Sequence, residues 1–177
     1  MRNFFANFFF CCLIAILSGA SSPKTEKMGF CEPFVFNVTP HDQKIICEIV
    51  STVGSTSTGL LLFKKSHLEE LGKKTNHIPP LQFLAYVFSK PDLVRQMEKI
   101  RSSGTKYKHF IAGFKAGLYH QYQVECLGTQ VEGFANYLSL NSDEVIASLR
   151  ISIKNCKEGV KDSCFRPFFD YLIDQKK

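Results

Sequence analysis

The chain has 177 residues, of which 45% are hydrophobic and 21% charged, proportions typical of a folded globular domain. These values exclude a wholly disordered chain and a multi-span membrane protein, and 11 glycines with 7 prolines exclude a collagen-like or low-complexity chain. The net charge of +6 is a modest basic excess, below that of a typical nucleic-acid-binding domain. Tryptophan is absent while phenylalanine reaches 17, so phenylalanine must supply much of any core.

Residues Met1–Ala20 have the pattern of an export signal peptide. Arg2 supplies a positive start, the apolar run 8–17 follows, and Ser18-Gly19-Ala20 offers small residues for cleavage. The apolar run is shorter than the roughly 20 residues that a transmembrane helix needs. We therefore expect cleavage after Ala20, export to the periplasm or the exterior, and a mature chain that is not an integral membrane protein. An uncleaved membrane anchor is the alternative.

The cysteines beyond the leader are odd in number, so at least one thiol is free or bonded to another molecule. In an oxidising compartment the others should pair. Cys156 and Cys164 flank a short turn between two expected helices, which brings their Cα atoms within bridging distance. Cys31 with Cys47 is the second candidate pair, and Cys126 is then left over. No Cys-x-x-Cys spacing occurs, which argues against a thioredoxin-like site or a zinc knuckle.

After the leader, the sequence divides into an N-terminal extended or β segment, residues 21–58, and a helical domain, residues 59–177. Within the first segment, 30–38 and 44–50 are rich in Phe, Val and Ile and are separated by turn residues, which predicts two short strands. Pro33 places the first strand at a sheet edge or outside a sheet.

From residue 59 onward the apolar spacing is that of helices. Gly72 is a predicted helix end, and Pro79-Pro80 a predicted start. Ser89 is a predicted N-cap for the helix whose first turn contains Pro91, and residues 102–104 break that helix.

Capping boxes beginning at Thr129 and Asn141 predict two further helices, and Pro167 fits the first turn of a last one. The clearest apolar face comprises Tyr107, Phe110, Ile111, Phe114 and Leu118. The predicted fold is mainly α: a bundle of about six helices with a short N-terminal β or extended segment.

The run His-Ile-Pro-Pro-Leu-Gln-Phe-Leu-Ala-Tyr-Val-Phe-Ser-Lys-Pro-Asp-Leu at residues 77–93 resembles a segment of small, uncharacterised exported proteins of chlamydial-type intracellular bacteria. The resemblance covers the helical part, from about Leu61 onward, and this segment is not an active-site motif. It implies a bacterial periplasmic or secreted setting, and it transfers no activity.

The motif spacing yields no catalytic residue, no cofactor site and no metal site. The Gly-x-x-x-x-Gly of residues 54–59 lacks the Lys-Ser/Thr pair that a phosphate loop needs, and the Ser-x-x-Lys of residues 103–106 lacks its companion motifs. His109 and His120 would lie about 16 Å apart along one helix, too far to share an ion. Cys126 with His120 as its base would lack an orienting third group.

The charge feature above background lies between Glu98 and Glu125, where five basic residues occur with no acid among them. Lys108 and Lys115 share one side of the expected helix, away from its apolar face. This predicts a basic stripe that docks an acidic protein surface or anionic lipid headgroups, with a solvated face as the alternative. Nucleic acid is an unlikely partner for an exported protein. The proposed binding residues are Lys99, Arg101, Lys106, Lys108 and Lys115.

Three function classes remain. An exported helical interaction or adaptor protein fits the basic stripe, the odd cysteine and the missing catalytic constellation. A helical carrier of an apolar small ligand is the second class, since the many phenylalanines can line a cavity. An enzyme with an unrecognised site is the third.

Overall fold

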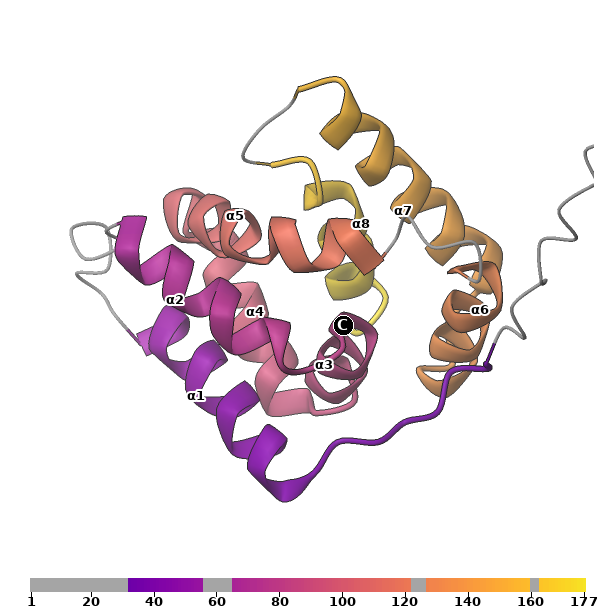
Figure 1. Ribbon diagram of the computed structural model, residues 1–177, viewed down its shortest axis with the longest axis horizontal. Helices are drawn as coiled ribbons and strands as arrows, with labels where there is room; N and C mark the ends of the chain where they lie inside the picture. Colours follow the sequence, from indigo (N-terminus) through magenta and orange to yellow (C-terminus); the bar gives the residue numbers. More distant parts are fainter. Residues whose placement is uncertain (1–31, 56–64, 122–126, 160–162) are drawn as a thin grey trace, which may run out of the picture. The chain divides into compact units, whose positions relative to one another are not determined.

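The computed structural model describes residues 32–55, 65–121, 127–159 and 163–177 (Figure 1). The chain divides into two compact units, Met1–Phe30 and Cys31–Lys177, and every described residue belongs to the second. The described residues form eight helices and no strand, which confirms the predicted mainly α fold. The predicted leader, Cys31 and Cys126 lie outside the described residues.

The helices are numbered in chain order. Their bounds are α1 Pro40–Ser55, α2 Lys65–Asn76, α3 Pro80–Phe88, α4 Pro91–Ser102, α5 Gly104–Gln121, α6 Leu127–Tyr137, α7 Ser142–Lys157 and α8 Arg166–Asp174. The helix pairs with the most extensive contacts are α2 with α5, α7 with α8, α1 with α4, and α6 with α7. Within the described ranges, none of these helices has the length and apolar character that crossing a bilayer requires.

Helix α3 lies at the centre of the second unit (Figure 1). It packs against α1, α2, α4, α5 and α6. Seven of its nine residues are buried, as expected for a helix that is apolar on nearly all sides. Its start at Pro80 confirms the prediction from Pro79-Pro80, because proline fits the first helical turn, where the amide has no helical partner.

Phenylalanine rings from three helices form the middle of the core. Phe114 of α5 lies 4.8 Å from Phe83 of α3 and 4.6 Å from Phe110, measured between ring centroids. Phe169 of α8 meets Phe110 edge-on at 5.7 Å. The predicted apolar face of α5 is confirmed where side chains are described, because Tyr107, Phe110, Ile111 and Phe114 are at most 2% exposed. The side chain of Leu118 lies outside the described residues.

The second predicted strand is wrong, because residues 44–50 lie within α1. β-branched residues there favoured a strand, yet their spacing along the chain also fits a helix, and burial against α3 and α4 decides between the two. Thr39 and Asp42 form a reciprocal capping box at the start of α1: the Thr39 hydroxyl accepts from the Asp42 amide at 3.1 Å, and the Asp42 carboxylate accepts from the Thr39 amide at 3.0 Å. The buried residues of α1 are Ile46, Ile49, Val50 and Val53.

Three predicted helix boundaries differ from those in the structure. Helix α2 continues through Gly72 to Asn76. Ser89 is not the N-cap of α4; that position is Lys90, and the Ser89 hydroxyl donates to the Tyr86 carbonyl instead. Helix α6 already begins at Leu127, so Thr129 lies inside it.

The predicted cap at Asn141 is confirmed, because its side chain accepts from the amides of Asp143 and Glu144 at 3.0 and 3.2 Å.

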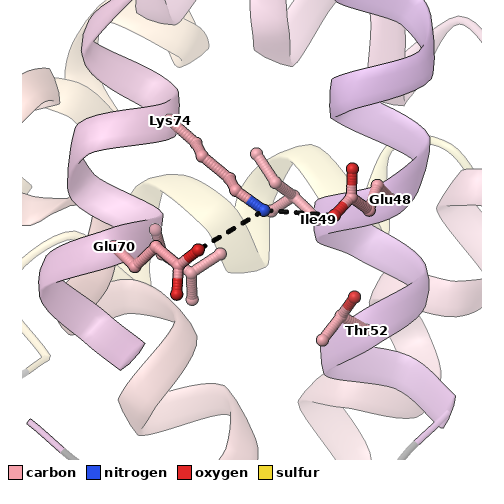
Figure 2. Close-up of a pocket in the computed structure, with 6 residues that line it drawn as sticks. Glu48, Ile49, Thr52, Glu70 and Lys74 are labelled. Atoms are coloured by element: carbon pink, nitrogen blue, oxygen red, sulfur yellow. Dashed lines mark hydrogen bonds and ion pairs between the residues drawn. The ribbon is translucent and has the colours of Figure 1, made fainter. Parts of the chain in front are cut away.

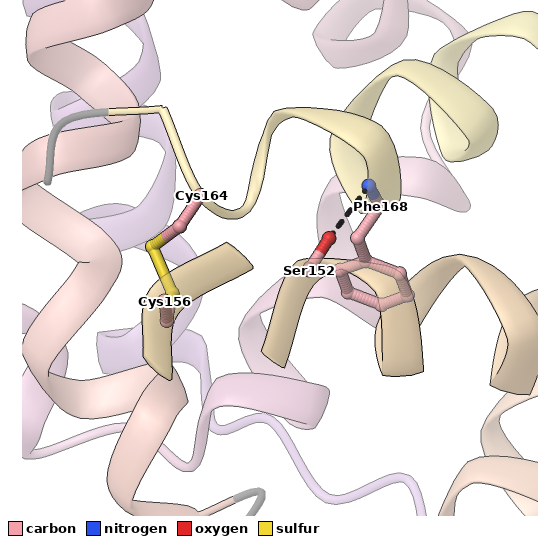
Figure 3. The surroundings of a disulfide bond; sticks show 4 residues. All are labelled: Ser152, Cys156, Cys164 and Phe168. Atoms are coloured by element: carbon pink, nitrogen blue, oxygen red, sulfur yellow. Dashed lines mark hydrogen bonds between the residues drawn. A yellow bond between two sulfur atoms is a disulfide. The ribbon is translucent and has the colours of Figure 1, made fainter. Parts of the chain in front are cut away.

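Helices α7 and α8 are tied together at two adjacent points (Figure 3). The predicted disulfide Cys156–Cys164 is present, with the two Cα atoms 4.9 Å apart. One turn earlier on α7, the buried Ser152 hydroxyl accepts a hydrogen bond from the Phe168 amide at 3.1 Å, which caps the first turn of α8. The second candidate disulfide is wrong, because the Cys47 thiol is free.

We expect Ser152→Ala to lower the free energy of unfolding by about 1–3 kcal/mol, because the buried Phe168 amide loses its acceptor. Ser148→Ala is the matched control: Ser148 is also buried on α7, but its hydroxyl bonds only to the Val145 carbonyl of its own helix. Urea denaturation of both variants measures the difference. Equal losses in the two variants would show that the contact between the helices adds nothing.

Candidate interaction surfaces

The predicted basic stripe is not continuous in the structure. Lys99 and Lys108 are exposed, but Lys106 is only 9% exposed. Arg101 forms ion pairs with two carboxylates. The side chain of Lys115 lies outside the described residues. The five residues therefore do not form one exposed basic face, which corrects the surface expected from their spacing.

Arg101 belongs to a neutral cluster of charges that joins α4 to the end of α8. Its guanidinium lies 2.7 Å from an Asp174 carboxylate oxygen and 3.7 Å from Glu98. The Lys177 ammonium lies 3.0 Å from Glu98 and 3.4 Å from Asp174. The hydrogen bond from Arg101 holds the pKa of Asp174 below its usual value. Two cations and two carboxylates offset one another here, so the cluster fastens α8 and presents no net charge to a partner.

Tyr107 lies beside this cluster, fully buried on α5. Its hydroxyl donates to Asp170 at 2.8 Å, and the guanidinium of Arg166 lies 5.1 Å from the centre of its ring. Burial, and then the bond to Asp170, raises the pKa of Tyr107 far above its usual value. The Tyr107 hydroxyl therefore joins α5 to α8 as a hydrogen-bond donor. Arg101 and Asp174 complete a shallow depression with Arg166 and Asp170.

A cavity of about 240 Å³ lies between α1 and α2 (Figure 2). The Lys74 ammonium lies between two carboxylates, 3.1 Å from Glu48 and 3.8 Å from Glu70. Buried Ile49 and Leu71 form its apolar wall. The three charged side chains are between 37% and 60% exposed, and such surface pairs contribute about 0–1 kcal/mol each. The described residues contain no cluster of three or more His, Cys, Asp or Glu side chains that could hold a metal ion. The ion pair of Lys74 with Glu48 joins α2 to α1.

The exposed side of α7 carries a basic surface that was not predicted from the sequence. Arg150, Lys154 and Lys157 follow the spacing i, i+4 and i+7, which puts them on one side of the helix. Lys154 lies 3.8 Å from Glu158. Within the ranges that the structure describes, Arg150 and Lys157 have no ion pair. We call this region the α7 surface, and its residues are Arg150, Ile151, Ile153, Lys154 and Lys157.

The α7 surface is hollowed and partly apolar. A cavity of about 400 Å³ is lined by Ile153, the three basic side chains and Glu158. Ile151 is 52% exposed beside them, one of three large apolar side chains that are exposed among the residues with described side chains. The spacing Arg-x-x-x-Lys-x-x-Lys could have indicated this site from the sequence.

A family model matches residues 38–158, which contain α1 through α7 and therefore the whole α7 surface. The chain belongs to this Family of unknown function (DUF8085). Helix α8 and Cys164 lie beyond the matched residues, as do residues 32–37 on the other side. A comparison with curated proteins and another with solved structures found no match.

We expect the protein to lose stability as the pH rises from about 10 to about 12. Burial, and then a 3.1 Å hydrogen bond to Glu144, raises the pKa of Tyr171 to about 12. A group whose pKa is higher in the folded state contributes its full stability below its unfolded pKa, about 10 for tyrosine. That contribution is lost as the pH rises through the folded value.

Urea denaturation between pH 9 and pH 12, roughly the range in which tyrosine titrates, measures this loss. Tyr171→Phe should flatten the decline, because the variant has no hydroxyl whose pKa the fold raises. An identical decline in wild type and Tyr171→Phe would contradict the assignment.

Proposed function

We propose that the protein is an exported helical interaction or adaptor protein whose α7 surface binds an acidic surface of a partner protein. The observation that carries this proposal is which basic side chains have a carboxylate partner and which do not. Arg150 and Lys157 have no carboxylate partner among the described residues, whereas Arg101 of the predicted stripe has two. Unpaired cations attract carboxylates, and the apolar hollow that they surround can bury an apolar side chain of the same partner.

The shape of the α7 surface favours a protein over a lipid bilayer. A hollow of about 400 Å³ admits an inserted side chain, with the cations of its rim placed to meet carboxylates around it. A bilayer instead presents a broad interface into which a helix places a continuous apolar face. The exposed Ile151 and the half-buried Ile153 are too few for such a face.

Export is supported by the leader pattern at Met1–Ala20 and by the disulfide. A Cys156–Cys164 bond is typical of an oxidising compartment outside the cytosol. The resemblance of residues 77–93 to exported proteins of chlamydial-type bacteria agrees with a periplasmic or secreted location. The competing idea of an apolar-ligand carrier draws no support from the phenylalanines, because those of α3, α5 and α8 contact one another in the core.

N-terminal sequencing of the exported protein should begin at Ser21, because Ser18-Gly19-Ala20 provides the cleavage site. Recovery of exported material that still begins at Met1 would contradict cleavage. Replacing Ala20 by a bulky residue, as in Ala20→Phe, should leave the leader attached and serves as the control.

The binding proposal predicts that Arg150→Glu/Lys157→Glu weakens binding of a fluorescent Glu/Leu peptide by about tenfold or more. The matched control is Lys99→Glu/Lys108→Glu, which changes the net charge equally at two exposed positions of the predicted stripe. Fluorescence anisotropy at increasing salt measures both, and wild-type binding should weaken with salt because exposed charges are screened beyond about 8 Å. Thermal melts should show near-native stability, since exposed substitutions usually cost within about 0.5 kcal/mol.

Equal weakening by the two double variants would show that net charge alone drives binding and would overturn the α7 surface. Vesicles of phosphatidylglycerol and phosphatidylcholine provide the second arm. If the α7 residues mediate tighter binding to these vesicles than to the peptide, the partner is a membrane and the acidic-protein proposal fails.

A further inference from the structure

The eight residues before α1 form an extended strap, residues 32–39 (Figure 1, indigo). Its side chains alternate: Phe34, Phe36 and Val38 are partly buried against the core, whereas Val35 and Asn37 are exposed. No residue of the strap is fully buried. The segment 30–38, predicted as a strand from its Phe, Val and Ile content, is therefore extended over its described part and has no neighbouring strand among the described residues.

Gln82 of α3 takes the place of that missing strand. Its side-chain amide nitrogen donates to the Val35 carbonyl, and its amide oxygen accepts from the Asn37 amide at 3.1 Å. This is the pair of hydrogen bonds that a residue of a parallel strand would make across from Phe36. A single glutamine thus binds the backbone of an extended segment, and these two hydrogen bonds do not depend on which side chains the segment carries.

Helix α6 contacts the two aromatic side chains of the strap. Phe34 meets Phe134 edge-on at 6.0 Å, and Phe36 stacks on Tyr137 at 4.5 Å, measured between ring centroids. A Cβ atom at Gly133 would lie 2.8 Å from the Cβ of Phe34, so the absence of a side chain there permits the contact.

The groove is wider than the strap that occupies it. A cavity of about 480 Å³ remains beside the strap, bounded by Pro79 and Gln82 on one side and Gln130 of α6 on the other. The strap is held by partial burial and by two hydrogen bonds from one side chain, which is weak anchoring compared with the buried helices around it.

We propose that the groove between α3 and α6 is a binding site for an extended segment of a partner protein with apolar side chains at alternating positions. The strap occupies this site in the free protein, and its Phe-x-Phe-x-Val pattern shows the chemistry that the groove accepts. Main-chain hydrogen bonds with pockets for alternate side chains are a general mode of peptide recognition. The site is separate from the α7 surface and does not depend on the function proposed for it.

The strap competes with any partner, because a tethered segment has an effective concentration of the order of millimolar. The probe is therefore a fluorescent peptide with the sequence of residues 32–39, Glu-Pro-Phe-Val-Phe-Asn-Val-Thr. The full chain carrying Phe34→Ser/Phe36→Ser, which weakens the strap, should bind this peptide at least about tenfold more tightly than wild type.

Two matched changes test the mode of binding in that weakened background. Gly133→Val should abolish binding by filling the space that the Cβ and backbone of the first Phe residue occupy. N-methylation of the peptide at its Asn residue, which removes the donor to Gln82, should weaken binding, whereas N-methylation at its Thr residue should be tolerated. In the intact chain the Thr39 amide bonds to Asp42 and not to the groove.

Wild-type protein provides a second test that needs no strap variant. A peptide with benzoylphenylalanine at the second Phe position should cross-link to α6 near Tyr137, and excess unlabelled peptide should suppress the product. Cross-links that the unlabelled peptide fails to suppress, or that map away from α3 and α6, would overturn the proposal. So would a folded Phe34→Ser/Phe36→Ser protein that binds the peptide no better than wild type.

Discussion

Burial of α3 on nearly all sides is the constraint on which the other packing depends. Five helices contact this nine-residue segment, so its Phe and Leu side chains set the positions of helices that are far apart in sequence. Gln82 is its polar exception, and its side chain bonds to the backbone of the extended strap. The same short helix therefore contacts the surrounding helices and holds the extended strap. A shift of α3 would move both the core packing and the strap.

Helix α7 illustrates how one element divides structural and binding roles between its two sides. Its inner side is fixed to α8 by the Ser152 hydroxyl and by the disulfide from Cys156. Its outer side carries Arg150 and Lys157 without ion pairs among the described residues. Because the inner side is fixed twice within one turn, the cations stand on a rigid support, which reduces the entropy lost when a partner binds.

Features that depend on neighbouring residues could be predicted from the sequence, whereas contacts between residues far apart in the chain could not. The proline start of α3, the Asn141 cap and the short Cys156–Cys164 turn each depend on neighbouring residues, and all three were predicted. Arg101 was assigned to an exposed stripe because its partner Asp174 is 73 residues away. The residues of α1 satisfy both strand and helix patterns, and only tertiary packing decides between them. The extended strap was anticipated, but a glutamine side chain as its partner has no sequence signature.

The position of α8 after the other described helices has a consequence for which part of the chain completes the core. Phe168, Phe169, Leu172 and Ile173 are fully buried, and Phe169 completes the ring cluster begun by α3 and α5. The matched region 38–158 does not include α8, so it lacks the ring that packs against Phe110 and Phe114 and does not contain a complete core by itself.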